Sequence, residues 1–65
     1  MPRYALRLKV EGRKSRVCRW IEADSMVSAI RFGERNWGHV SDASDEASVP
    51  DRLKLRFQKT LYRAP

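Results

Sequence analysis

The stretch YALRLKVEGRKSRVCRWIEA, residues 4–23, decides the fold of this chain. Every second side chain from Tyr4 to Val10 is apolar and most of those between are polar, which is the pattern of a half-buried strand. Gly12 then opens a short polar turn, where glycine tolerates a positive φ. Residues 16–23 are a second run rich in β-forming side chains. We therefore predict a β-hairpin with a basic tip.

The buried face of the second strand stays open between two alternatives. Either Val17 and Ile21 point toward the core, or Cys18 and Trp20 do. The first alternative also turns Arg19 inward, which requires a place near a sheet edge where its guanidinium reaches water.

A helix is predicted over residues 25–37. Asp24 and Ser25 are both favourable N-cap residues, and Gly38 suits the left-handed position after a helix. Gly33 on the buried helix face costs about 1 kcal/mol relative to alanine, so we expect close approach of helix and sheet there. The apolar face, at helical spacing, consists of Met26, Ala29, Ile30, Gly33 and Trp37.

Residues 39–50 differ in character from the rest of the chain. They are small, polar and acidic, and Pro50 ends them, which predicts a mobile acidic surface loop or at most a short helical turn. Four of the eight acidic residues of the chain fall in residues 41–51, without any Lys or Arg.

A third strand is predicted after this loop. Leu53, Leu55 and Phe57 alternate with basic residues and with Gln58, and residues 60–62 could extend the run. A helical interpretation would use Leu53 and Phe57 but would leave Leu55 on the wrong side, so we prefer the strand.

These elements give a single α+β domain over residues 1–65. We expect the order β-β-α-β, with a three-stranded antiparallel sheet in the order 2-1-3 and one helix packed on one face. Besides the inward side chains of the second strand, the expected core is Leu6, Leu8, Val10, Met26, Ala29, Ile30, Trp37, Leu53, Leu55 and Phe57.

Charge is the strongest feature of the composition. Fourteen Lys and Arg face eight Asp and Glu, giving a formal net charge of +6, and the pI is about 10.3. Ten of the fourteen basic residues are arginine, whose planar guanidinium binds phosphate and carboxylate in a bidentate manner. This bias indicates a polyanion or an acidic protein surface as partner.

Catalytic patterns are missing from the sequence. His39 is the only histidine and has no placed nucleophile or carboxylate. Cys18 is the only cysteine, which excludes an intrachain disulfide and a cysteine-based metal site and suits a reducing cytoplasm. We expect no enzyme, metal, cofactor, small-molecule substrate or membrane span.

The face of the sheet away from the helix is the expected binding site. Its cations would contact phosphates, and if Cys18 and Trp20 point outward, Trp20 would stack on a base. Like charges on neighbouring strands repel one another, which favours a binding role over a structural one. The candidate residues on this face and at the hairpin tip are Arg7, Lys9, Arg13, Lys14, Arg16, Trp20, Arg52, Lys54 and Arg56.

The stretch EADSMVSAI, residues 22–30, resembles a pattern in small proteins of phages and mobile elements, including some ββαβ anti-CRISPR proteins. There a hairpin ends in Glu-Ala, Asp or Ser caps the next helix, and Ala lies in its first buried turn. The resemblance covers residues 4–37 and implies Ile21 inward, Trp20 outward, and inhibition by covering protein surfaces that hold nucleic acid. Arg19 departs from the pattern, which prefers an apolar residue, and the C-terminal half does not match it.

The sequence thus predicts a small cytoplasmic, non-enzymatic binding protein, monomeric or homodimeric. Its leading function is nucleic-acid binding, to DNA or RNA, through the basic sheet face and hairpin tip. The alternative is a phage or mobile-element inhibitor, similar to anti-CRISPR proteins, that blocks the nucleic-acid-binding surface of a protein complex.

Overall fold

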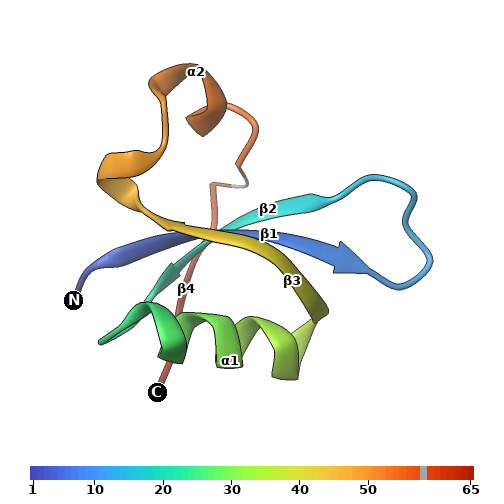
Figure 1. Cartoon of the computed structure of the whole chain (residues 1–65), viewed down its shortest axis with the longest axis horizontal. Helices are drawn as coiled ribbons and strands as arrows, with labels where there is room; N and C mark the ends of the chain where they lie inside the picture. Colours follow the sequence, from blue (N-terminus) through green and yellow to red (C-terminus); the bar gives the residue numbers. More distant parts are fainter. Residues whose placement is uncertain (58) are drawn as a thin grey trace.

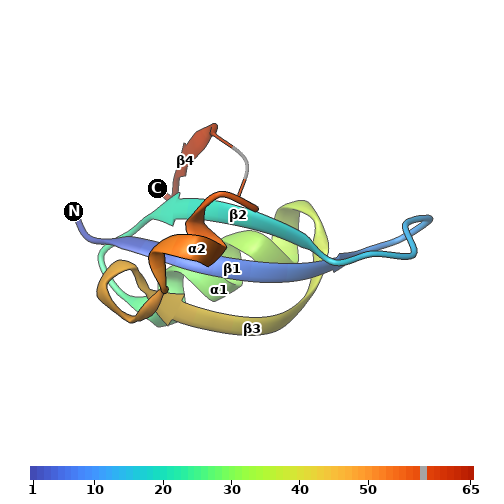
Figure 2. The ribbon, with the colours of Figure 1, turned by 90° about the horizontal axis from the view of Figure 1, so that it is seen from above.

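The computed structural model describes residues 1–57 and 59–65. It has the α+β architecture predicted from the sequence, with a four-stranded mixed sheet in the order β3-β1-β2-β4. Helix α1 covers one face of this sheet, and the short helix α2 lies across the other face (Figures 1 and 2). The elements in chain order are β1 (Arg3–Val10), β2 (Val17–Glu22), α1 (Met26–Asn36), β3 (Gly38–Asp45), the 3-10 turn η1 (Glu46–Ser48), α2 (Asp51–Lys54) and β4 (Leu61–Arg63).

Strand β1 occupies the expected central place. It pairs antiparallel with β2 on one side and with β3 on the other. The antiparallel hairpin and the central β1 were predicted from the sequence, but the second neighbour of β1 and the parallel addition of β4 to β2 were not.

The predicted acidic loop over residues 39–50 is wrong in its first half, which forms β3. Leu8 pairs with Val40 and Leu6 with Ala43, so two apolar side chains of β3 lie on the α1 side of the sheet. The register shifts between Arg7 and Leu8, which places an extra residue in β3. Residues 46–48 form the short turn η1, which agrees with the alternative prediction of a short helical turn in this stretch.

The predicted third strand over residues 53–57 is also wrong. This stretch contains the end of α2 and the turn that follows it. Leu53 and Phe57 are half-buried on the second face of the sheet, whereas Leu55 is 88% exposed. The segment therefore follows the helical spacing of Leu53 and Phe57, and Leu55, which was predicted in the core, lies in solvent. Gln58 lies outside the described residues.

Helix α1 confirms the predicted helix and its close approach to the sheet. The Ser25 hydroxyl accepts a hydrogen bond from the Ser28 backbone N–H at 3.2 Å, which caps the N-terminus. A Cβ built on Gly33 would lie 2.7 Å from Leu6 Cδ1, so only glycine allows this approach without a shift. Gly38, with φ of +128°, starts β3 directly after the helix.

The core lies between α1 and the inner face of the sheet. Of the residues expected there, Leu6, Leu8 and Ala29 are buried, and Val10, Ile30 and Trp37 pack against them half-buried. Ile21, Ala23 and Ala64 complete the buried cluster.

The pairing of β2 with β1 settles which face of β2 is buried. Val17 and Ile21 are buried beside α1, and Cys18 and Trp20 face the other way. Arg19 is indeed turned inward. Its guanidinium carbon lies 4.5 Å from the centroid of the Trp37 ring, and Arg19 Nη1 donates a hydrogen bond to the Tyr62 hydroxyl at 2.8 Å.

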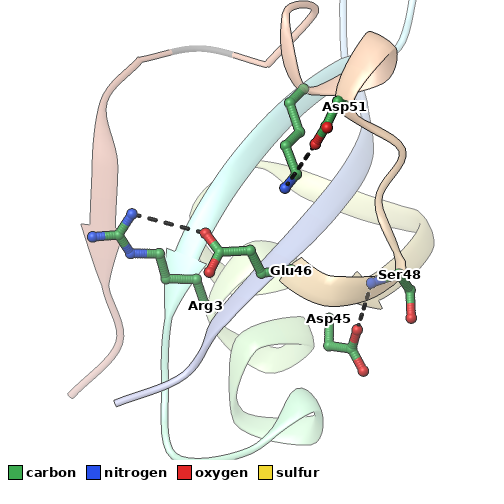
Figure 3. A network of polar contacts seen from close by, with 6 residues as sticks. Arg3, Asp45, Glu46, Ser48 and Asp51 are labelled. Carbon is green, nitrogen blue, oxygen red and sulfur yellow. Dashed lines mark hydrogen bonds and ion pairs between the residues drawn. The ribbon is translucent and has the colours of Figure 1, made fainter.

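Residues 46–57, here called the cover segment, close one end of the second face. Val49, Leu53 and Phe57 line a cleft together with Ala5 of β1, and the Phe57 ring lies 4.8 Å from the Trp20 ring. Polar contacts hold the start of the segment and the α2 turn in place (Figure 3). They are Arg3 with Glu46 at 3.9 Å, the Ser48 N–H donating to Asp45 Oδ1 at 2.8 Å, and Lys54 with Asp51 at 3.4 Å.

Candidate functional site

The part of the second face that the cover segment leaves open holds a cleft rich in cations. Arg7 and Lys9 of β1 point into it, because they alternate with Leu6 and Leu8, which face α1. Its volume is about 640 Å³ and it opens widely to solvent. We call it the cationic cleft; its lining residues are Arg7, Lys9, Lys14, Ser15, Arg16, Cys18 and Arg56.

Three separate segments supply the five cations of this cleft. Arg7 and Lys9 come from β1, Lys14 and Arg16 from the β1–β2 loop, and Arg56 from the turn after α2. The pairing of the sheet fixes the positions of Arg7 and Lys9, and the packing of the cover segment fixes the position of Arg56. Residues far apart in sequence thus meet at one site.

Arg16 is held across the face of the sheet. Its Nε donates a hydrogen bond to the Ser41 hydroxyl of β3 at 3.0 Å. Because β1 lies between β2 and β3, the Arg16 side chain must cross the β1 row that carries Arg7 and Lys9. Three positive charges are therefore gathered over the central strand.

None of the described residues that line the cationic cleft carries a carboxylate. Within residues 1–57 and 59–65, the ion pairs involve Arg3, Lys54 and Arg63 and none of the five cleft cations. The nearest acid by register is Asp42, which pairs with Arg7 across β1 and β3. Asp42 offsets only the charge of Arg7, so the like charges gathered in the cleft still repel one another, and a bound anion relieves that repulsion.

The β1–β2 loop extends the positive surface beyond the sheet. Residues 11–16, here called the arm, are all exposed and project from one end of the molecule (Figures 1 and 2). A Cβ built on Gly12 would meet no atom within 4 Å, so the tip stands clear of the body.

Two further clefts lie at the base of the arm and share residues with the cationic cleft. One, of about 320 Å³, is lined by Arg13, Lys14, Ser15, Arg16 and Val17. The other, of about 480 Å³, includes Lys9, Arg13 and His39. Together the three clefts surround the base of the arm with cations, and the acid Glu11 also lines the last of them.

The structure brings together most, but not all, of the residues predicted from the sequence. The cationic cleft is lined by Arg7, Lys9, Lys14, Arg16 and Arg56. Arg13 lines an adjoining cleft at the base of the arm.

Arg52 and Lys54 do not belong to this site, because their stretch is helical and not a strand. Both lie on α2, outside the lining of the cationic cleft, and Lys54 pairs with Asp51 at 3.4 Å.

Trp20 faces away from α1, as one alternative predicted, but it does not present a free stacking surface. It is half-buried and packs against Phe57. The predicted position of Phe57 in a strand placed that side chain on the opposite face, so its contact with Trp20 could not be anticipated.

Sequence reasoning also missed residues that shape the cleft. Ser41 holds Arg16, and Asp42 stands beside Arg7, but both lie in a strand that was predicted as a loop. Cys18 also lines the cleft. Its position follows from the burial of Val17 and Ile21, because Cys18 then faces the opposite side of the sheet.

Two other kinds of site find no support in the part of the chain that the structure describes. No group of three or more His, Cys, Asp or Glu side chains there could hold a metal ion. None of the helices formed by these residues is long and apolar enough to span a membrane.

Comparisons with known proteins give no family for this chain. No protein-family model, no curated protein and no solved structure matches it. Its function is therefore inferred from the geometry of the site alone.

Proposed function

We propose that this protein is a non-enzymatic module that binds nucleic acid by its phosphates. The observation that carries the proposal is the convergence of five cations from three chain segments in one open cleft, whose described lining residues include no carboxylate. Three of these cations are arginines, which bind phosphate with two parallel hydrogen bonds. A row of phosphates is the ligand that such a cleft suits best.

The composition of the cleft favours contacts to the backbone over contacts to bases. Its described lining residues include no aromatic side chain, and Trp20, on the same face of β2 as Cys18, packs against Phe57. Recognition of single strands relies on aromatic platforms for unpaired bases. Phosphate contacts position a nucleic acid without carrying sequence information, so we expect binding with little sequence preference.

An acidic protein surface is the alternative ligand for the same cations. It is the partner expected if the protein is a phage or mobile-element inhibitor, and that resemblance remains a prediction. Tight protein interfaces are anchored by aromatic or other large side chains in desolvated pockets. The cationic cleft presents no aromatic side chain for this purpose, which favours nucleic acid.

A fluorescence-anisotropy titration tests the proposal. The probes are labelled duplex DNA, single-stranded DNA and RNA of mixed sequence, at low and at physiological salt. We expect binding at low salt that weakens steeply as salt rises, since each phosphate contact releases counterions. If none of the probes binds at low salt, the proposal is wrong, and salt-tolerant capture of an acidic protein would support the alternative.

A further inference from the structure

The arm has a shape that limits what it can enter. Its chain leaves β1, turns at Gly12 with φ of +84°, and returns to β2, with the Arg13 N–H donating to the Val10 carbonyl at 3.1 Å. Figure 2 shows this loop edge-on as a single layer of chain, whereas Figure 1 shows its broad side. The arm is therefore a flat projection made of two passes of backbone.

The grooves of B-form DNA discriminate between such shapes. Paired strands lie about 5 Å apart in a sheet, and the arm is at least this wide because the pairing of β1 with β2 ends at Leu8 and Val17, before the arm opens out (Figure 1). The major groove, about 12 Å wide, accepts a two-stranded element, whereas the minor groove, about 6 Å wide, is too narrow for one. The deep, narrow major groove of A-form RNA is closed to side chains.

The side chains of the arm fit the same groove. Its tip carries Arg13 and Lys14 followed by Ser15, all exposed. Arginine and lysine donate hydrogen bonds to the acceptors that guanine presents in the major groove. Proteins that pry open the minor groove insert apolar wedges, and residues 11–16 contain no apolar side chain larger than glycine.

The cationic cleft lies at the base of the arm, where flanking phosphates would be. Lys14 and Arg16 line both the cationic cleft and one of the arm clefts, and Lys9 lines the cationic cleft and the other. An arm seated in a groove would bring the phosphates that border the groove onto these shared cations. The cations shared between the clefts thus link the arm to the cationic cleft, as contact with one duplex requires.

From these observations we propose that the arm enters the major groove of duplex DNA while the cationic cleft holds the adjacent phosphates. This inference rests on the proposed nucleic-acid binding and specifies its partner. It predicts that duplex DNA is preferred over single-stranded DNA and over duplex RNA of the same sequence, without bending of the DNA.

Competition with groove-specific ligands tests the inference on the intact chain. The anisotropy of labelled duplex DNA bound to the protein is followed while methyl green, a major-groove ligand, or netropsin, a minor-groove ligand, is added. We expect methyl green to displace the protein and netropsin to leave it bound. Displacement by netropsin alone, or equal binding of duplex RNA, would overturn the inference while leaving the proposed function intact.

A pair of variants with matched charge locates the contact. Arg13→Ala/Lys14→Ala removes two cations from the exposed arm, and Arg31→Ala/Arg35→Ala removes two from the exposed side of α1, on the opposite face of the sheet. We expect the arm variant to lose roughly tenfold or more in duplex affinity, as a lost groove contact implies, and to lose its preference for duplex over single strands. The α1 variant should keep both.

Two outcomes of the variant experiment contradict the inference. The first is equal loss in the arm and α1 variants, which would indicate a general charge effect. The second is an arm variant that weakens on duplex and single-stranded DNA alike, which would place the arm on phosphates only. If the wild-type chain binds no nucleic acid at low salt, the proposed function itself fails.

Discussion

Removing two guanidiniums from the cationic cleft should change the salt dependence of DNA binding by a fixed amount. Arg7→Ala/Arg16→Ala deletes one cation of β1 and the arginine that Ser41 holds across the sheet. Both side chains are exposed and neither forms an ion pair within the described residues. The variant should therefore fold, and its loss should appear in binding.

The magnitude follows from the number of cations in the cleft. If each of the five contacts one phosphate, the logarithm of the affinity for duplex DNA falls with the logarithm of salt concentration with a slope of about −4.5, and affinity drops roughly 500-fold between about 50 and 200 mM salt. With three cations left, the slope becomes about −2.7. Arg13, the arm cation outside the cleft lining, would steepen both values equally.

Anisotropy titrations of duplex DNA at four or more salt concentrations would measure these slopes. The Arg31→Ala/Arg35→Ala variant is the control, since it has the same net charge but leaves the cleft intact. Circular dichroism would verify that both variants are folded. Equal slopes for the two variants would refute the assignment of phosphate contacts to the cationic cleft.

Three further predictions concern the fold and the borders of the site. Gly33→Ala should lower the melting temperature by about 4–8 °C in a thermal scan, because an overpacking cost of about 2 kcal/mol outweighs the gain of about 1 kcal/mol in helix propensity; an unchanged melting temperature would contradict the close helix–sheet contact. Phe57→Ala should uncover Trp20, shifting tryptophan emission to longer wavelength and tightening single-stranded DNA binding roughly tenfold; no change in either would contradict the stacking of the two rings. Asp42→Asn should raise duplex DNA affinity about twofold at low salt by removing a negative charge beside Arg7; lower affinity would show that Asp42 assists binding.

The hairpin and α1 could be predicted from sequence because their patterns are complete over a whole element. In β1 the alternation runs unbroken, and in α1 the apolar face is flanked by the Ser25 cap and by Gly38. The close approach of helix and sheet predicted at Gly33 is confirmed, because a Cβ built there would lie 2.7 Å from Leu6 Cδ1. Local signals of this kind agree with the tertiary structure.

Strand β3 could not be predicted, because the register shift breaks its pattern. Its two inward apolar residues, Val40 and Ala43, are three positions apart, and a period of two never appears. Its remaining side chains are polar because β3 forms a sheet edge, where charges and bulges discourage further pairing. The acidic composition that indicated a loop is thus the composition of an edge strand.

The stretch 53–57 satisfies two periods at once. Leu53, Leu55 and Phe57 alternate as in a strand, and Leu53 and Phe57 also share one side of a helix. Contacts with the second face of the sheet decide between them, and the exposed Leu55 is the consequence. Because this stretch is not a strand, Arg52 and Lys54 lie outside the cleft, and Phe57 covers one side of Trp20. The errors in the predicted site therefore all come from this one element.

Occupation of the cationic cleft by nucleic acid can be measured at Cys18. This half-buried thiol is the only one in the chain and lines the cleft, so its alkylation by iodoacetamide, a neutral reagent, reports whether the cleft is covered. At low salt and saturating duplex DNA, we expect a clear slowing of alkylation, reversed when high salt releases the DNA. An alkylation rate that stays unchanged while anisotropy shows the DNA bound would place the binding site elsewhere.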